Sequence, residues 1–270
     1  MSDYQTRFGG IARLYGTQQA TWLQQAKFCV VGIGGVGTWM AEALARSGVG
    51  HITLIDLDDI CTTNTNRQIH ALTDTVGEAK VDVMAQRIKS INPDCQVEVL
   101  EDFVTVDNLY DCFGDKSSPK FDFVLDAIDS IAAKTALIAH CKRHKIPLVV
   151  TGGAGGQTDP SLIQYGDLAK TTHDPLLSKV RNQLRRDFNF SKNPKRKFAI
   201  DCVFSTEQLQ YPQADGSVCA AKTSADGSMR LDCNMGFGAA TMVTGSFGFF
   251  AAAKAISKFL QKKQRAQEQK

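Results

Sequence analysis

The feature that most limits the possible folds of this chain is a glycine-rich turn between an apolar run and a helix-like segment. Residues 28–33, FCVVGI, are apolar throughout, GIGGVG at 32–37 fits G-x-G-x-x-G, and GTWMAEALARSG at 37–48 has helical spacing. This order is typical of the first strand, turn and helix of a Rossmann-like fold, where phosphate oxygens lie at the helix N-terminus. It predicts an adenine-nucleotide site without choosing among NAD, FAD and ATP.

Strand and helix patterns then alternate along the chain. Strand-like segments recur at 51–56, 96–101, 121–129 and 146–153, and helix-like ones at 78–91 and 132–144. Apolar strands alternating with helices indicate a parallel sheet covered on both faces. A second group of elements follows, with strands at 161–168 and 196–205, a helix at 174–188 and a polar loop at 206–232. We therefore expect an α/β fold: a Rossmann-like, mostly parallel sheet with helices on both faces, plus a C-terminal extension of mixed strands and helices.

The 270 residues allow one large domain, or one and a half. We expect one continuous domain with an adenylating, nucleotide-binding part at 1–155 and a C-terminal part at 156–262. The Lys- and Gln-rich end at 263–270 is expected to fray.

The eight cysteines include no CxxC pair, so no zinc site is expected. The first ten residues, MSDYQTRFGG, have neither a basic nor an apolar region typical of a signal peptide, which together with unpaired cysteines favours the cytoplasm. Residues 236–256 are long enough to be mistaken for a membrane span. Because they are mainly small residues, we expect a buried helix and no stable membrane partner.

Charged and polar residues near the predicted strand ends favour a triphosphate over a dinucleotide. Asp56 ends the second strand, where a ribose-binding carboxylate belongs. Asn64 and Arg67 follow that strand, and Lys80 lies early in the next helix. Asp126 and Asp129 end the fourth predicted strand within LDAID, and Arg7 precedes the first. Several cations with a carboxylate suit phosphates and a Mg²⁺ ion.

GIGGVG, DLDD with N-T-N-RQ, Lys80 and LDAID resemble the adenylating domain of the ThiF/MoeB and ubiquitin-activating-enzyme superfamily, over about residues 5–155. The family reaction is attack of a carboxylate on the α-phosphate of ATP, giving an acyl-adenylate and pyrophosphate. The resemblance implies that Asp56 binds ribose, Asp129 binds Mg²⁺ and Arg7 reaches the partner's ATP in a homodimer, with Arg13 as a near alternative. The ATP-binding residues that it implies are Gly32, Gly34, Gly35, Gly37, Asp56, Asn64, Arg67 and Lys80.

The C-terminal half of the chain indicates which branch of this superfamily the sequence resembles. CVFSTEQLQYPQ at 202–213 and DCNMGFGAATMVTGSFG at 232–248 resemble the family of tRNA threonylcarbamoyladenosine dehydratases. That resemblance implies ATP-driven cyclisation of a modified adenosine beside the anticodon, with loss of water. It leaves room for a monovalent cation such as Na⁺ or K⁺ and for cysteine-desulfurase or sulfur-acceptor partners. Two alternatives are a sulfur-carrier adenylyltransferase, whose usual CxxC pairs are missing here, and a nucleotide-sensing protein without turnover.

A basic segment at 179–198 supports an RNA partner. It contains eight cations and one carboxylate in a chain whose total charge is only +3. Such a local excess is the electrostatic footprint of a phosphate-binding surface, although a solvated helix face is the ordinary alternative. The candidate RNA-binding residues are Lys179, Arg181, Arg185, Arg186, Lys192, Lys195, Arg196 and Lys197.

Cys233 precedes the small-residue helix. A thiol near a helix N-terminus can have a lowered pKa and act as a nucleophile. Cyclisation of an adenylate does not require one, so a catalytic role and a role as a buried small residue stay equally open. The candidate catalytic residues are Arg7, Lys80, Asp129 and Cys233.

Overall fold

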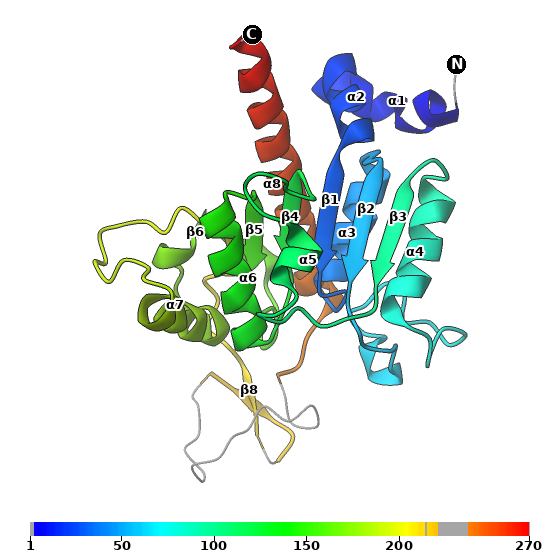
Figure 1. The fold of residues 1–270 in the computed structure, drawn as a ribbon. Coiled ribbons are helices and arrows are strands. Elements are labelled where there is room, and N and C mark those ends of the chain that lie inside the picture. Colours follow the sequence, from blue (N-terminus) through cyan, green and yellow to red (C-terminus); the bar gives the residue numbers. More distant parts are fainter. Residues whose placement is uncertain (1–2, 214, 221–236, 270) are drawn as a thin grey trace.

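The centre of the molecule, a computed structural model that describes residues 3–213, 215–220 and 237–269, is a seven-stranded sheet (Figure 1). The strand order is β3-β2-β1-β4-β5-β7-β6, and all neighbours are parallel except β6 and β7. This confirms the expected Rossmann-like, mostly parallel sheet. The strands are β1 (Lys27–Val31), β2 (His51–Ile55), β3 (Gln96–Leu100), β4 (Phe123–Asp126), β5 (Leu148–Thr151), β6 (Ile163–Asp167) and β7 (Asp201–Ser205).

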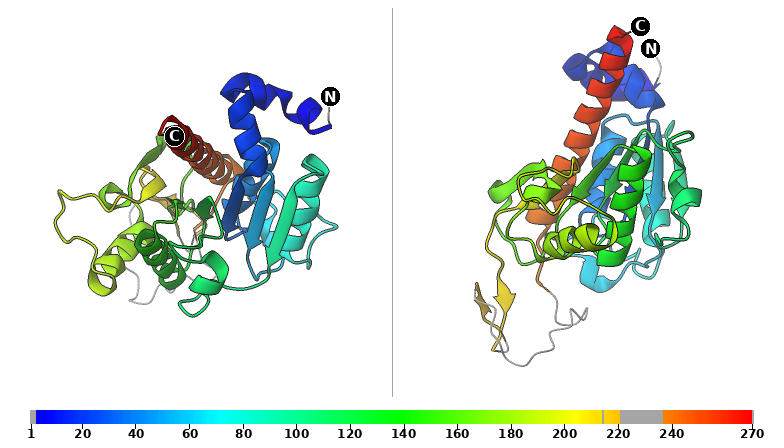
Figure 2. Two further views of the ribbon diagram at one scale, coloured as in Figure 1. Left: turned by 45° about the horizontal axis from the view of Figure 1, so that its top comes forward. Right: turned by 60° about the vertical axis from the view of Figure 1, so that its left-hand side comes forward.

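Helices cover both faces of this sheet (Figure 2). One face carries α3 (Gly37–Arg46), α4 (Lys80–Ile91) and α8 (Thr241–Glu268). The other carries α5 (Leu109–Phe113), α6 (Ile131–His144) and α7 (Pro175–Asp187). Two further helices, α1 (Asp3–Tyr15) and α2 (Thr17–Gln25), lie at the end of the sheet where β1 begins (Figure 1).

The apolar strands of the sequence are explained by burial on both faces. In β1, Phe28 and Val30 belong to the core under α3 and α8, whereas Cys29 and Val31 face the core under α6. Phe28 meets Phe259 of α8 edge-on at 5.4 Å between ring centroids. Cys29 and Cys141 are fully buried, as residues of a core should be.

Small residues let α8 lie close to α3, as the sequence predicted for a buried helix. A Cβ on Gly248 would come within 2.7 Å of both the Trp39 Cβ and the Val36 carbonyl oxygen. No helix within the described ranges is long and apolar enough to cross a membrane. The helix also continues to Glu268, past the point where fraying was expected, and Lys263 packs over the Phe259 ring and approaches Asp122 at 3.8 Å.

Some elements were not anticipated from the sequence. They are α1, α2, α5, the hairpin of β8 (Tyr211–Pro212) and β9 (Val218–Cys219), and the 3-10 turns η1 (Thr62–Asn64), η2 (Pro160–Leu162) and η3 (Leu168–Lys170). The strand expected from residue 196 begins only at Asp201. The Asp167 carboxylate accepts hydrogen bonds from the Phe198 and Ala199 amides, and Ala199 has a positive φ of 54°. These contacts hold residues 198–199 in a bend instead of a strand.

Candidate nucleotide site

The glycine-rich turn joins β1 to α3 as the sequence predicted, and two of its glycines are required by the backbone. Gly32 has a φ of 86°, and a Cβ there would lie 2.9 Å from the Ala127 carbonyl oxygen. A Cβ on Gly37 would overlap the Gly32 carbonyl oxygen at 1.7 Å. The turn therefore brings the start of α3 against the loop that follows β4.

Of the other two glycines, Gly34 leaves open space beside the helix N-terminus, whereas Gly35 packs against the Arg67 and Thr244 side chains. A Cβ on Gly34 would meet only the Gln68 side chain at 3.9 Å, so packing within the protein does not require glycine there. The amides of residues 34–37 donate to no group of the described residues. Unpaired amides at a helix N-terminus form a site for phosphate oxygens, and the missing side chain lets those oxygens approach the backbone.

Asp56, at the carboxyl end of β2, fastens this loop. Its Oδ2 accepts a hydrogen bond from the Ile33 amide at 2.5 Å, and its Oδ1 accepts one from the Asp58 amide at 2.9 Å. Burial raises the pKa of Asp56, and these two hydrogen bonds and the nearby Lys80 offset part of the rise. The carboxylate therefore shapes the loop.

Lys80, Asn64 and Arg67 surround the same edge of the sheet. The Lys80 side chain is buried, and its Nζ lies 2.7 Å from Asp58 Oδ2, a partner that the sequence analysis did not assign. Asn64 accepts the Cys61 amide at 3.0 Å through Oδ1, which stabilises η1. Arg67 Nη1 donates to the Thr63 carbonyl oxygen at 2.7 Å, with the Arg67 stem 3.3 Å from a Cβ placed on Gly35.

His70 contacts the backbone of the glycine-rich loop, a role that the sequence did not predict. It is almost fully buried, and its Nε2 lies 3.0 Å from the Ile33 carbonyl oxygen. Since a carbonyl only accepts, Nε2 carries the proton in this contact. Burial lowers the pKa of His70 to about 4, so the ring is neutral at physiological pH.

The two aspartates of LDAID differ sharply in environment. Asp126 is fully buried and pairs with the equally buried Lys134 at 3.1 Å. Burial raises the pKa of Asp126, and Lys134 offsets part of that rise. Asp129 lies in the exposed turn before α6 and contacts no charged or hydrogen-bonding group within the described part of the chain. Of the two, only Asp129 can offer a carboxylate to a bound ion.

Lys134 also influences the charge of Asp174 in the C-terminal part. Its Nζ donates to the Ile128 carbonyl oxygen at 2.9 Å, one residue before Asp129. Asp174, which begins α7, is buried nearby; its carboxylate accepts the Gly153 amide after β5 at 2.9 Å and the Leu177 amide at 2.8 Å. Burial raises the pKa of Asp174, and Lys134 is one of the charges that oppose the rise.

Other predicted residues lie apart from this edge. Arg7 is in α1, at the end of the sheet opposite the glycine-rich turn, and pairs with Asp3 at 2.6 Å (Figure 1). It cannot reach the nucleotide loop of its own subunit without a large rearrangement. Cys233 lies outside the described residues. Within those residues, no three His, Cys, Asp or Glu side chains gather as metal ligands.

Some cationic side chains of the basic segment contact other residues of the protein, and others are exposed without an ion pair to the described residues. Arg181 is half-buried and donates to the Thr171 hydroxyl, Arg185 lies over the Phe198 ring, and Arg186 pairs with Asp187 at 2.7 Å. Burial lowers the pKa of Arg181. The exposed side chains without an ion pair to the described residues are Lys179, Lys192, Lys195, Arg196 and Lys197.

Comparison with known proteins identifies the family. The model of the ThiF family matches residues 9–270. The chain belongs to the ThiF family. This ThiF-family chain is 59% identical to the tRNA threonylcarbamoyladenosine dehydratase of Escherichia coli (strain K12), over 96% of this chain and 95% of the relative. It is 52% identical to the dehydratase of the same name from Haemophilus influenzae, over 97% of each chain.

A solved structure gives the same result for the fold. The crystal structure of the E. coli tRNA N6-threonylcarbamoyladenosine dehydratase, TcdA, in complex with ATP has a TM-score of 0.85 to this chain. The two are 54% identical, and the match covers 98% of each. The nearly complete coverage means that the C-terminal part of this ThiF-family member, and not only its nucleotide-binding part, has a counterpart in that enzyme.

Proposed function

We propose that this chain is an ATP-dependent tRNA threonylcarbamoyladenosine dehydratase. The observation that carries the proposal is identity of 59% along nearly the whole chain to an enzyme of that name. The glycine-rich turn supports the ATP part, because the unpaired amides at the start of α3 suit phosphate oxygens. The substrate is then a tRNA with threonylcarbamoyladenosine beside the anticodon, and the protein acts where tRNA is found, in the cytoplasm.

The proposed reaction has two steps, adenylation of the carboxylate and cyclisation. A carboxylate oxygen of the threonyl group attacks the α-phosphorus of ATP, and the bond to pyrophosphate breaks. The carbamoyl nitrogen or oxygen of the same substrate then attacks the acyl carbon, the carbamoyl N–H proton passes to solvent, and AMP leaves with the former carboxylate oxygen. The net loss from the nucleoside is one water, and no protein thiol is needed for the balance.

The residues of the site have separate roles in this proposal. The amides of residues 34–37 and the side chains of Asn64, Arg67 and Lys80 hold the phosphates, while Asp58 keeps the Lys80 ammonium at the loop. Asp56 lies beside the ribose and fixes the loop through the Ile33 amide. These contacts hold the α-phosphorus for in-line attack and stabilise its added charge.

Asp129 is the proposed ligand for Mg²⁺, since it is exposed and its carboxylate has no cationic partner among the described residues. When bound, Mg²⁺ would neutralise charge on the phosphates. We further propose a homodimer in which Arg7 serves the partner's site. A Na⁺ or K⁺ site, a cysteine-desulfurase partner and a role for Cys233 stay predictions of the family resemblance.

Mass spectrometry of tRNA nucleosides tests the function. Incubation of the protein with ATP and tRNA carrying threonylcarbamoyladenosine should lower the mass of that nucleoside by one water, with AMP and pyrophosphate formed in equal amounts. Omitting ATP is the control. If the nucleoside is unchanged but a small ubiquitin-like protein ending in Gly-Gly is adenylated, the sulfur-carrier alternative is correct. ATP binding without turnover of either substrate would favour a nucleotide sensor.

A further inference from the structure

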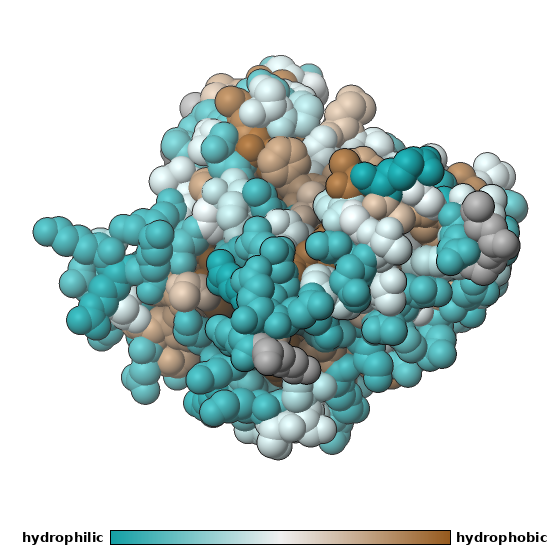
Figure 3. All heavy atoms as spheres, turned by 90° about the horizontal axis from the view of Figure 1, so that it is seen from above, coloured by the Kyte–Doolittle hydropathy of each residue, from teal (hydrophilic) through white to brown (hydrophobic). Residues whose placement is uncertain are grey.

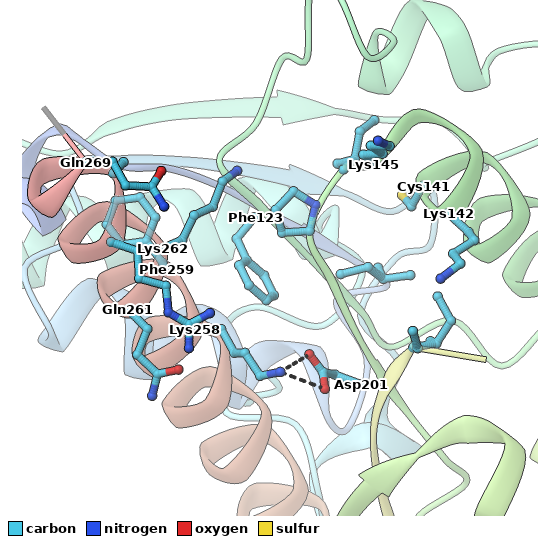
Figure 4. Close-up of a pocket in the computed structure, with 17 residues that line it drawn as sticks. Phe123, Cys141, Lys142, Lys145, Asp201, Lys258, Phe259, Gln261, Lys262 and Gln269 are labelled. Atoms are coloured by element: carbon cyan, nitrogen blue, oxygen red, sulfur yellow. Dashed lines mark hydrogen bonds and ion pairs between the residues drawn. The ribbon is translucent and has the colours of Figure 1, made fainter. Parts of the chain in front are cut away.

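A second basic surface lies at the end of the sheet opposite the nucleotide loop. It is a groove of about 680 Å³ between the last turns of α8, the C-terminal end of α6 and the chain entering β7. Figure 4 shows Lys142 and Lys145 on one side and Lys258 and Lys262 on the other, with Phe123 between them. Its charged lining residues are Lys142, Lys145, Lys258, Lys262, Arg265 and Asp201.

Most of this positive charge is not neutralised. The one carboxylate of the lining, Asp201, pairs with Lys258 at 3.0 Å (Figure 4). It also accepts a hydrogen bond from the Tyr165 hydroxyl. The other four cations make no ion pair or hydrogen bond to the residues that the structure describes. Four unpaired cations around one groove repel one another, and an anionic ligand would relieve that repulsion.

The distribution of the cations points to an extended polyanion. Lys258, Lys262 and Arg265 share one face of α8, spaced by four and three residues, and the facing lysines come from a different helix. All are exposed, so they do not converge on one buried phosphate. The aromatic rings in the lining, Phe123 and Phe259, are buried and cannot stack on bases. Contacts to a phosphate backbone, without reading of bases, fit this arrangement.

The basic segment leads along the chain into the lining of the groove. Lys195, Arg196 and Lys197 are exposed and directly precede residues 199–201, which line the groove. Figure 3, which looks down on this end of the molecule, shows hydrophilic side chains that project on the left and others that gather over the middle of the face. The cations of the loop thus precede the groove lining along the chain, and the two sets together are called the basic track.

The distance between the groove and the nucleotide loop is short enough for one tRNA molecule to contact both. Thr244, near the start of α8, lies 3.4 Å from a Cβ placed on Gly35 of the nucleotide loop. Lys262 lies further along the same helix, about 27 Å away at about 1.5 Å per residue. A folded tRNA is longer than this. We propose that the groove binds the phosphate backbone of the tRNA substrate, away from the nucleotide being modified; this rests on the proposed function.

Salt-dependent binding tests the groove directly. Lys142→Gln and Lys262→Gln each remove one charge from opposite walls, and Lys89→Gln removes one exposed charge from α4 as a matched control. Fluorescence anisotropy with unmodified and modified tRNA over a salt series should give a log–log slope lower by about one unit in each groove variant and unchanged in the control. In turnover assays, KM for tRNA should rise with Kd while kcat is unchanged.

If both groove variants show the same salt-dependence slope as Lys89→Gln, the inference is wrong. That result is expected if the groove binds an acidic protein instead of RNA. The proposed function fails by a different result. A wild-type protein that leaves the modified nucleoside unchanged would refute the dehydratase, while the binding slopes would still report whether the groove holds RNA.

Discussion

The Lys134 ammonium lies 3.1 Å from the Asp126 carboxylate, and both side chains are completely buried at the carboxyl end of β4. Removing one member of a buried ion pair leaves an uncompensated charge, which costs about 3–5 kcal/mol. Lys134→Met should therefore lower the free energy of unfolding by about that amount. Urea unfolding followed by circular dichroism measures it.

A second variant distinguishes lost charge from lost packing. Adding Asp126→Asn to Lys134→Met removes the unpaired carboxylate, so the double variant should recover part of the stability. If the double variant is as unstable as the sum of the two single variants, the two charges do not stabilise each other and the pairing argument is wrong.

His70 should make stability depend on pH. Its pKa is about 4 when folded, below the ordinary value of 6.5. Below pH 6.5 the unfolded chain binds a proton that the folded chain does not, so this contribution is present above that pH and is lost as pH falls toward about 4. The shift corresponds to about 3 kcal/mol at most.

His70→Gln keeps an N–H donor for the Ile33 carbonyl oxygen but cannot titrate. Between about pH 7 and about pH 5, wild type should lose more stability than this variant in urea unfolding. The difference between the two proteins isolates His70 from the carboxylates that titrate in the same range. Identical pH dependence in both proteins would mean that His70 takes up its proton equally well in the folded chain.

The sequence predicted the parts of the site that depend on local pattern. Apolar runs ending in glycine or aspartate located β1, β2 and β4, because strands buried on both faces leave no polar positions. The glycine turn was also found from its local pattern, G-x-G-x-x-G between a strand and a helix. Gly32 and Gly37 proved to be required by the backbone geometry. The ends of elements were less accurate, as the late start of β7 at Asp201 illustrates.

Contacts between distant residues could not be predicted in this way. Asp58 and Lys80 are 2.7 Å apart, and Lys134 reaches back to Asp126, but nothing in the local spacing indicates either pair. One signal for Lys134 was present: it is a lysine among Ala132, Ala133, Ala136 and Leu137, so it is the one charge in a mainly apolar first half of the helix. Such a lysine predicts a buried carboxylate nearby without identifying it.

Asp129→Ala should lower turnover severely and leave the fold intact. The side chain is exposed and has no hydrogen-bonded partner in the described part of the chain, so stability should change by less than about 0.5 kcal/mol. Loss of the Mg²⁺ ligand should lower kcat by about a hundredfold or more. Formation of AMP with modified tRNA is the assay. Activity close to wild type would show that another group holds the ion.

The exposed cations of the loop should contribute to tRNA binding independently of the nucleotide site. Changing Lys195, Arg196 and Lys197 to Ala should reduce the salt-dependence slope by about three units if all three contact phosphates. ATP affinity, measured by calorimetry without tRNA, should be unchanged, because these residues lie away from the glycine turn. A triple variant with the wild-type slope would mean that this run is only solvated surface.

The position of Arg7 makes the proposed dimer testable by complementation. Because α1 lies at the opposite end of the sheet from the glycine turn, Arg7 is far from the nucleotide loop of its own subunit, and we propose that it acts at the partner's site. Arg7→Ala and Asp129→Ala proteins should each be inactive alone. After subunit exchange, half of the dimers should be mixed, each with one intact site, so the mixture should show about a quarter of wild-type activity. Light scattering verifies the dimer, and exchange is followed with differently tagged chains. No recovery after verified exchange would mean that Arg7 acts in its own subunit, and full activity of Arg7→Ala alone would transfer the role to Arg13 or remove it.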